Sequence, residues 1–188
     1  DGVEAQLDDL MAGQFSSTTT LTGKAAFVVG SVDDETHTGT AATDETTFNY
    51  MYQLNLNSSF TGEDNLYTKI VSGNFEEDST FADSTGGAAL DVNEVTGNGL
   101  EIAKLWYTFP VGDSIQAWVG PRIENSDMLA SSPSIYVPVT KQFALGGNGS
   151  AYGSVTSPGL GAAWTQSVDD PSEARFAVSG NWTSRQGD

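Results

Sequence analysis

The chain has 188 residues, of which 38% are apolar, and its 25 acidic side chains against 7 Lys and Arg give a net charge of -18 at pH 7. This charge argues against nucleic acid as a partner, because phosphate would repel the chain. The absence of cysteine excludes disulfides, thiolate metal sites and cysteine nucleophiles. No apolar run approaches the roughly 18 residues of a spanning helix. A soluble β-domain, or a β-structure with an alternating membrane face, remains.

Residues 1–13 differ in pattern from the rest of the chain. Val3, Leu7 and Leu10 recur at helical spacing, and Gly13 ends the pattern. We therefore expect a short N-terminal helix end there. From Thr18 onward the pattern changes to the period of two that is typical of strands.

The clearest strand pattern runs through residues 48–60, where apolar and polar residues alternate. One face is aromatic or aliphatic and the other is almost entirely amide. The apolar positions are Phe48, Tyr50, Tyr52, Leu54 and Leu56, and the opposite positions are Asn49, Met51, Gln53, Asn55 and Asn57.

Weaker alternation predicts six more strands, and no long helical pattern separates any of them. Parallel crossovers are therefore not expected, and neighbouring strands should pair antiparallel. The sequence predicts an all-β, antiparallel up-and-down meander. Its seven expected strands cover residues 18–29, 48–60, 66–75, 102–111, 114–120, 159–168 and 174–183.

The predicted connections alternate in length. Short turns at 61–65, 112–113 and 169–172 alternate with long loops at 30–46, 76–99 and 121–158. Short turns at one end and long loops at the other are the layout of outer-membrane barrels. We therefore expect residues 14–188 to form part of a transmembrane β-barrel, with a soluble sandwich as the alternative.

If the apolar face meets lipid, the amide face lines water. Basic residues lie in or next to the strands, at positions that share a face with the amides. The predicted pore-lining residues are Lys24, Asn49, Gln53, Asn55, Lys69, Lys104, Arg122 and Arg175. Most acidic residues instead fall in the long loops. The third loop contains its own apolar residues, and we expect it either to fold into the barrel or to pack on a neighbouring subunit. Its candidates for a pore constriction are Glu124, Asp127 and Lys141.

The sequence offers no support for catalysis, a metal site or a cofactor. The one histidine, His37, lies in an acidic, Thr-rich loop without an obvious orienting partner. The acidic runs 33–35 and 76–78 lack the spacing of a calcium loop. In a barrel, the aromatic residues Tyr50, Tyr52, Trp106 and Tyr107 would be candidates for the interfacial girdles.

Four blocks resemble cyanobacterial outer-membrane porins. The block QFSSTTTLTG (14–23) is similar to the junction where a coiled coil passes into the first strand, and LNLNSSFTGEDNL (54–66) to the second strand and its turn. The blocks GNF (73–75) and LWYTFPVGD (105–113) resemble the next landmarks. The resemblance covers roughly residues 14–113, and none of these blocks is a catalytic motif.

The resemblance implies a passive channel of the carbohydrate-porin-related group, also described as iron uptake porins. Such channels are usually homotrimers in the outer membrane. Family members carry an S-layer-homology domain that binds a peptidoglycan-linked polymer, then a coiled coil, then a barrel of about sixteen strands. From this resemblance we expect residues 1–188 to lack that domain and to hold only the end of a coiled coil, at residues 1–11.

Seven strands cannot close an ordinary bacterial barrel, which has an even number of at least eight. We therefore expect the chain to be an amino-terminal part of a longer porin, or several copies to share strands. The expected function is passive diffusion of small hydrophilic solutes and inorganic ions, without enzymatic activity. The alternative is a secreted or surface-exposed acidic β-sandwich with an adhesive or filament-forming role.

Overall fold

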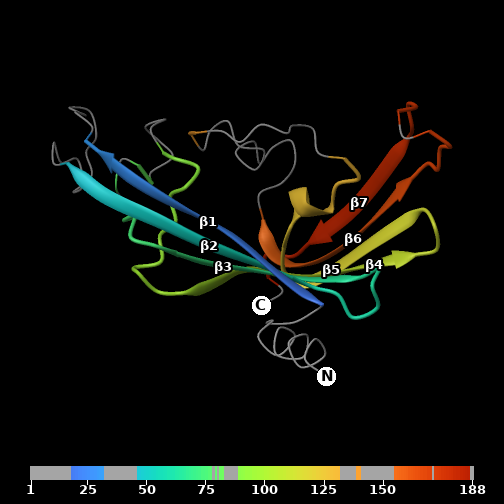
Figure 1. Ribbon diagram of the computed structural model, residues 1–188, viewed down its shortest axis with the longest axis horizontal. Helices are drawn as coiled ribbons and strands as arrows, with labels where there is room; N and C mark the ends of the chain where they lie inside the picture. The colour runs from blue at the N-terminus through green and yellow to red at the C-terminus, as the bar shows by residue number, and fades with distance from the viewer. Residues whose placement is uncertain are drawn as a thin grey trace, which may run out of the picture.

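One antiparallel sheet of seven strands in chain order makes up the fold (Figure 1). The computed structural model describes residues 18–31, 46–77, 79, 81–82, 89–131, 139–140, 155–170 and 172–186. The strands are β1 (Thr19–Gly30), β2 (Thr47–Ser58), β3 (Asn65–Gly73), β4 (Glu101–Val111), β5 (Ile115–Glu124), β6 (Thr156–Thr165) and β7 (Ala177–Thr183), and a 3-10 turn, η1 (Asn125–Met128), follows β5. The predicted all-β meander is confirmed. The expected helix end at 1–13 lies outside the described residues.

The register carries the alternation of β2 into its neighbours. Phe27 of β1 lies opposite Tyr50, and Lys24 lies opposite Gln53. Because side chains alternate between the faces of a sheet, one face collects the apolar residues and the other collects amides and lysines. The apolar face continues to β7, where Trp182 lies opposite Leu160.

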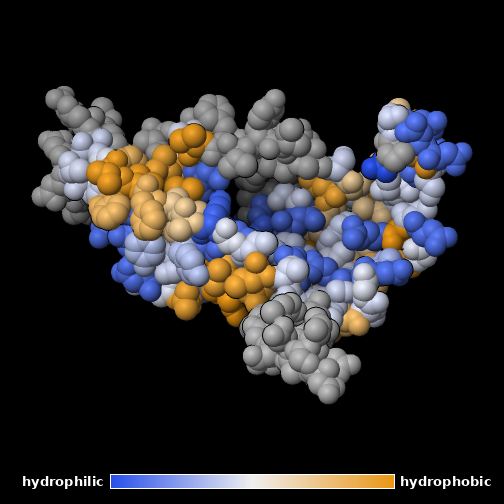
Figure 2. Space-filling model, viewed as in Figure 1, coloured by the Kyte–Doolittle hydropathy of each residue, from blue (hydrophilic) through white to orange (hydrophobic). Residues whose placement is uncertain are grey.

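The sheet twists and curves into a trough, with η1 above its concave side (Figure 1). Figure 2 shows apolar side chains gathered at the left of the view, with hydrophilic residues in the central hollow. The apolar face is the convex one, and no second sheet covers it in the described part of the chain. Its large side chains that are at least 39% exposed are Leu21, Phe27, Val29, Phe48, Tyr52, Ile102, Val111, Ile115, Val119, Leu160, Trp164, Phe176, Val178 and Trp182.

Burial is concentrated on the concave face. Trp118, Ile123 and Ala163 of β5 and β6 pack with Met128 of η1 into a small core. Met51 and Val71 are also almost fully buried, on the concave face of β2 and β3. A sandwich would instead bury the convex residues, so this core differs from the one expected for the soluble alternative.

Short and long connections separate to opposite ends of the sheet. The turns 59–64 and 112–114 and the described part of 166–176 lie at one end, and the ends of β1, β3 and β5 from which the longer connections leave lie at the other. The third short connection is longer than expected because β6 ends at Thr165 and β7 begins only at Ala177. Among the described residues the sheet is open, with β1 and β7 as its two edges.

Candidate functional site: the concave polar face

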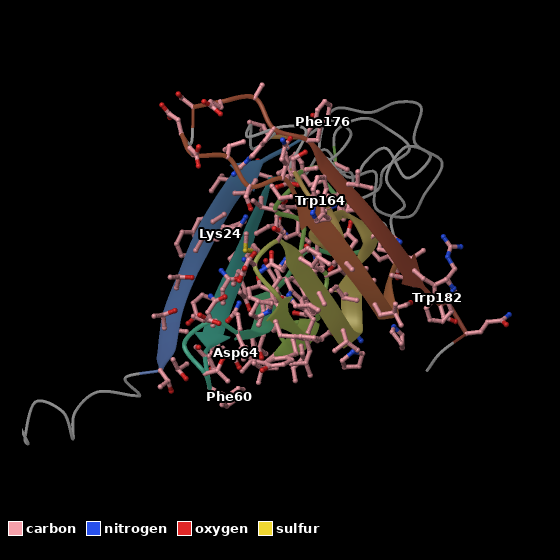
Figure 3. All side chains as sticks on the ribbon, turned by 90° about the vertical axis from the view of Figure 1, so that its right-hand side faces the viewer. Lys24, Phe60, Asp64, Trp164, Phe176 and Trp182 are labelled. Carbon is pink, nitrogen blue, oxygen red and sulfur yellow. The ribbon has the colours of Figure 1, made fainter. Side chains whose placement is uncertain are left out.

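Most of the predicted pore-lining residues lie on the concave face. Register pairs Lys24 with Gln53 and pairs Asn55 with Lys69, all on the face opposite to Phe27. Asn49 lies on the same face of β2, and its amide donates to the carbonyl oxygen of Asn74 at 3.4 Å. Figure 3 shows Lys24 beside β1 and Trp182 at the end of β7, with the sheet curving between these two strands.

Arg122 differs from the expectation. Its register partner is Leu105, and its neighbour Ile123 is fully buried on the concave face. The exposed side chain of Arg122 therefore belongs to the convex face, and its Nε donates to the carbonyl oxygen of Ala103 at 3.3 Å. The reason is a register shift between Gly120 and Ile123, which changes the parity that simple alternation would give.

Lys69 and Lys104 lie directly opposite each other in the register of β3 and β4. Like charges in such a pair repel unless carboxylates balance them. The Nζ of Lys69 lies 3.6 Å from Oε1 of Glu94. The Nζ of Lys104 lies 2.7 and 2.9 Å from the two carboxylate oxygens of Asp127, and 3.1 Å from Oε2 of Glu124. Lys69 thus has one carboxylate partner, from the connection between β3 and β4, and Lys104 has two, from the end of β5 and from η1.

Met128 anchors η1 to the concave face. Its side chain is fully buried in the core described above. Gly161 of β6 makes room for it, since a Cβ there would lie only 2.8 Å from the Met128 sulfur. This packing places Asp127 within reach of Lys104. Glu124 and Asp127, two of the three candidates for a constriction, therefore lie against the wall, and Lys141 lies outside the described residues.

Asn125 at the start of η1 adds a polar connection to β7. Its amide donates to Oδ1 of Asn181 at 2.8 Å, and its own Oδ1 accepts from the Thr183 hydroxyl at 3.0 Å. The amide of Asn181 donates back to the carbonyl oxygen of Asn125 at 3.2 Å. The segment that leaves β5 is therefore bound to both β4 and β7.

Trp106 is not on the convex face, so its expected place in an interfacial girdle is wrong. Its register partner is Tyr67, and the two rings lie 4.2 Å apart on the concave face. The ammonium of Lys104 lies 5.8 Å from the Trp106 ring. Tyr52 and Tyr107 do lie on the convex face, opposite Ala25 and Leu66 respectively.

Tyr67 is a concave residue that the sequence reasoning did not select. Its hydroxyl donates to Oδ1 of Asn55 at 2.7 Å, and the same oxygen accepts from the amide of Gln53 at 2.7 Å. Tyr67 lies two residues before Lys69 and therefore shares its face of the strand, which is the sequence signal that could have identified Tyr67 as a concave residue. The amides of β2 are thus held in fixed orientations by hydrogen bonds.

A pocket of about 510 Å³ opens near the connections 112–114 and 166–176. Arg175, the last of the predicted pore-lining residues, lies on its wall together with Asp113 and Gln116. Trp118 and Thr165 contribute to the same wall. Arg175 is therefore at the end with the short connections, away from the lysines of β3 and β4.

Features of two other kinds are absent from the part of the chain that the structure describes. The described residues contain no group of three or more His, Cys, Asp or Glu that could hold a metal ion. They also contain no helix whose length and apolar character would let it span a membrane.

Comparisons found similar proteins in two cyanobacteria. The protein named "Uncharacterized protein alr4550" of Nostoc sp. (strain PCC 7120) is 38% identical over 120 residues, covering 60% of this chain and 20% of the relative. The protein named "Uncharacterized protein sll0772" of Synechocystis sp. (strain PCC 6803) is 28% identical over 120 residues, covering 64% of this chain and 22% of the relative. The chain therefore spans about a fifth of the length of the curated relatives it matches. No family model and no solved structure matches it.

Proposed function

We propose that the chain forms part of the wall of an outer-membrane channel, through which small hydrophilic solutes and inorganic ions diffuse passively. The observation that carries the proposal is the uncovered convex face. Phe27, Phe48 and Trp182 are 73%, 66% and 59% exposed there. Soluble monomers rarely expose a contiguous apolar surface of more than a few hundred Å². Lipid acyl chains would cover this face without a second layer of protein.

The concave face supports the same proposal from the other side. It carries amides, hydroxyls and paired charges, which suit a water-filled lumen. Apolar and polar side chains alternate most clearly along β2, as a barrel wall between lipid and water requires. The inward position of η1 supports a narrowed passage, because Asp127 and Met128 occupy space that would otherwise belong to the lumen.

A channel wall in lipid needs partners for both sheet edges. Unpaired backbone groups of β1 and β7 would face hydrocarbon, which offers no hydrogen bonds. The proposal therefore includes further strands that close the barrel, supplied by the same polypeptide or by other copies. We extend it, on the resemblance to the porins, to a homotrimer in the outer membrane that is anchored to the peptidoglycan-linked polymer by a separate domain.

Planar lipid bilayers test this proposal on the whole protein. We expect stepwise conductance increments that scale with the salt concentration, because a water-filled pore conducts without a binding step. A protein that gives no increments, and that stays a monodisperse monomer in water without detergent, would contradict the channel and favour the soluble alternative.

A further inference from the structure

We propose that the pore prefers cations, because carboxylates on the concave face neutralise the lysines of its wall. This inference rests on the proposed channel function and names the solute class. From the sequence alone, a basic wall and acidic loops pull the ion preference in opposite directions. The contacts on the concave face decide between them.

Lys69 and Lys104 contribute little positive charge to the lumen. The ammonium of Lys69 has Glu94 at 3.6 Å. The ammonium of Lys104 has two carboxylates, Asp127 at 2.7 Å and Glu124 at 3.1 Å. One lysine with one carboxylate is neutral, and one lysine with two carboxylates carries a net negative charge.

This excess negative charge is accessible to ions in the lumen. The side chains of Lys104, Glu124 and Asp127 are 18%, 18% and 20% exposed. Asp127 belongs to η1, Glu124 directly precedes it, and Met128 of η1 packs on the concave face. A permeating ion would therefore pass close to a cluster with an uncompensated carboxylate.

The remaining charges of the concave face do not reverse this balance. Lys24 is exposed on β1 and has no ion pair among the described residues. Glu101 at the start of β4 is also exposed, and its register partner Val71 places it on the concave face. No charged residue lies in β6 or β7. Arg175 lines the pocket at the end with the short connections, and Asp113 lines the same pocket. The charges of Lys24 and Glu101 offset each other, as do those of Arg175 and Asp113, so the excess carboxylate of the Lys104 cluster remains, in a chain whose net charge is -18.

The sign of the selectivity follows from Coulomb attraction in a water-filled passage. A single charge several Å from an ion in water changes the ratio of cations to anions by roughly two- to threefold at moderate salt. We therefore expect the permeability ratio of potassium to chloride to exceed one. Neutralising the excess carboxylate should lower it by about that factor.

Reversal potentials of the whole protein in a potassium chloride gradient test this inference. Asp127→Asn keeps a hydrogen-bond acceptor for Lys104 and removes one negative charge, so the cation preference should fall. Lys24→Gln removes a positive charge from β1, which does not belong to the Lys104 cluster, so the cation preference should rise. Glu63→Gln, in the exposed turn between β2 and β3, is the matched control and should change it least.

Two results would overturn the inference and leave the channel in place. The first is an anion-selective wild-type pore, and the second is a selectivity that neither Asp127→Asn nor Lys24→Gln changes. A protein that forms no pore would instead remove the proposed function, and the inference with it. A cation preference that falls in Asp127→Asn and rises in Lys24→Gln would support the inference.

Discussion

The hydroxyl of Tyr107 donates a hydrogen bond to the carboxylate of Asp64, and so joins β4 to the turn between β2 and β3. The other oxygen of Asp64 accepts from the backbone N–H groups of Phe60 and Thr61 and from the hydroxyls of Ser59 and Thr61. This single carboxylate therefore organises the turn and attaches it to the next strand.

The same contacts make the turn sensitive to acid. The hydrogen bond from Tyr107 is the largest influence on the pKa of Asp64, and burial opposes it. The donors of Thr61 and Ser59 act with Tyr107, so the pKa lies well below its usual value of 3.8. A lowered pKa in the folded state stabilises the fold above the unfolded-state pKa, and this contribution is lost as the pH falls below it.

We therefore expect Asp64→Asn to lower the thermal unfolding midpoint at pH 7, and the difference from wild type to shrink as the pH falls below about 4. Thermal unfolding of both proteins in detergent from pH 7 to pH 2.5 measures it. A difference that stays constant across this range would mean that the ionised carboxylate is not the stabilising group.

Removing Lys104 should cost more stability than removing Lys69. Lys104→Met leaves two partly buried carboxylates, Glu124 and Asp127, without their cation, and we expect a loss of about 2 kcal/mol. Lys69→Met breaks one longer and more exposed pair, and we expect roughly 0.5 kcal/mol. Urea unfolding of the refolded proteins measures both losses. Equal losses would contradict the special role given to the Lys104 cluster.

Exchanging two neighbouring residues of β1 separates the lipid-facing side from the water-facing side. The double variant Lys24→Ala/Ala25→Lys keeps the composition and the net charge, but it moves the ammonium from the concave to the convex face. A lysine facing lipid costs about 2–4 kcal/mol at the bilayer midplane and less near the interfaces. We expect the double variant to be less stable than wild type in lipid vesicles by an amount in this range.

The single variant Lys24→Ala is the control for the exchange, and it should fold into vesicles almost as well as wild type. Folding yield and urea unfolding in vesicles would report both effects. If the double variant is as stable as Lys24→Ala, the convex face of β1 does not contact lipid.

Much of the fold follows from local pattern. The alternation of residues 48–57 assigns two faces to β2, and an antiparallel register transfers that assignment from strand to strand as far as Trp182. The alternating connection lengths likewise indicate a meander. These features are local or repeat regularly, so one sequence is enough to detect them.

The sequence reasoning was wrong where a register shift changes the parity. Arg122 lies within the register shift between Gly120 and Ile123, so counting by two from Trp118 gives the wrong face. Trp106 was assigned to the girdles with Tyr107, although adjacent residues of a strand point to opposite faces. Glu124 and Asp127 were predicted only as candidates for a constriction, and their contact with Lys104 was not predicted. Met128, the last residue of η1, packs into the core of the concave face and so holds Asp127 near Lys104, a contact without a sequence signature.

Tryptophan fluorescence in vesicles of brominated lipid is the most direct test of the central claim, that the convex face contacts acyl chains. Two of the four tryptophans, Trp164 and Trp182, are exposed on this face, whereas Trp106 and Trp118 lie on the concave face. We predict that brominated lipid quenches the wild-type protein, that Trp164→Phe/Trp182→Phe loses most of the quenching, and that Trp106→Phe retains it. Quenching that survives the double substitution, or that is absent from the wild type, would contradict the account.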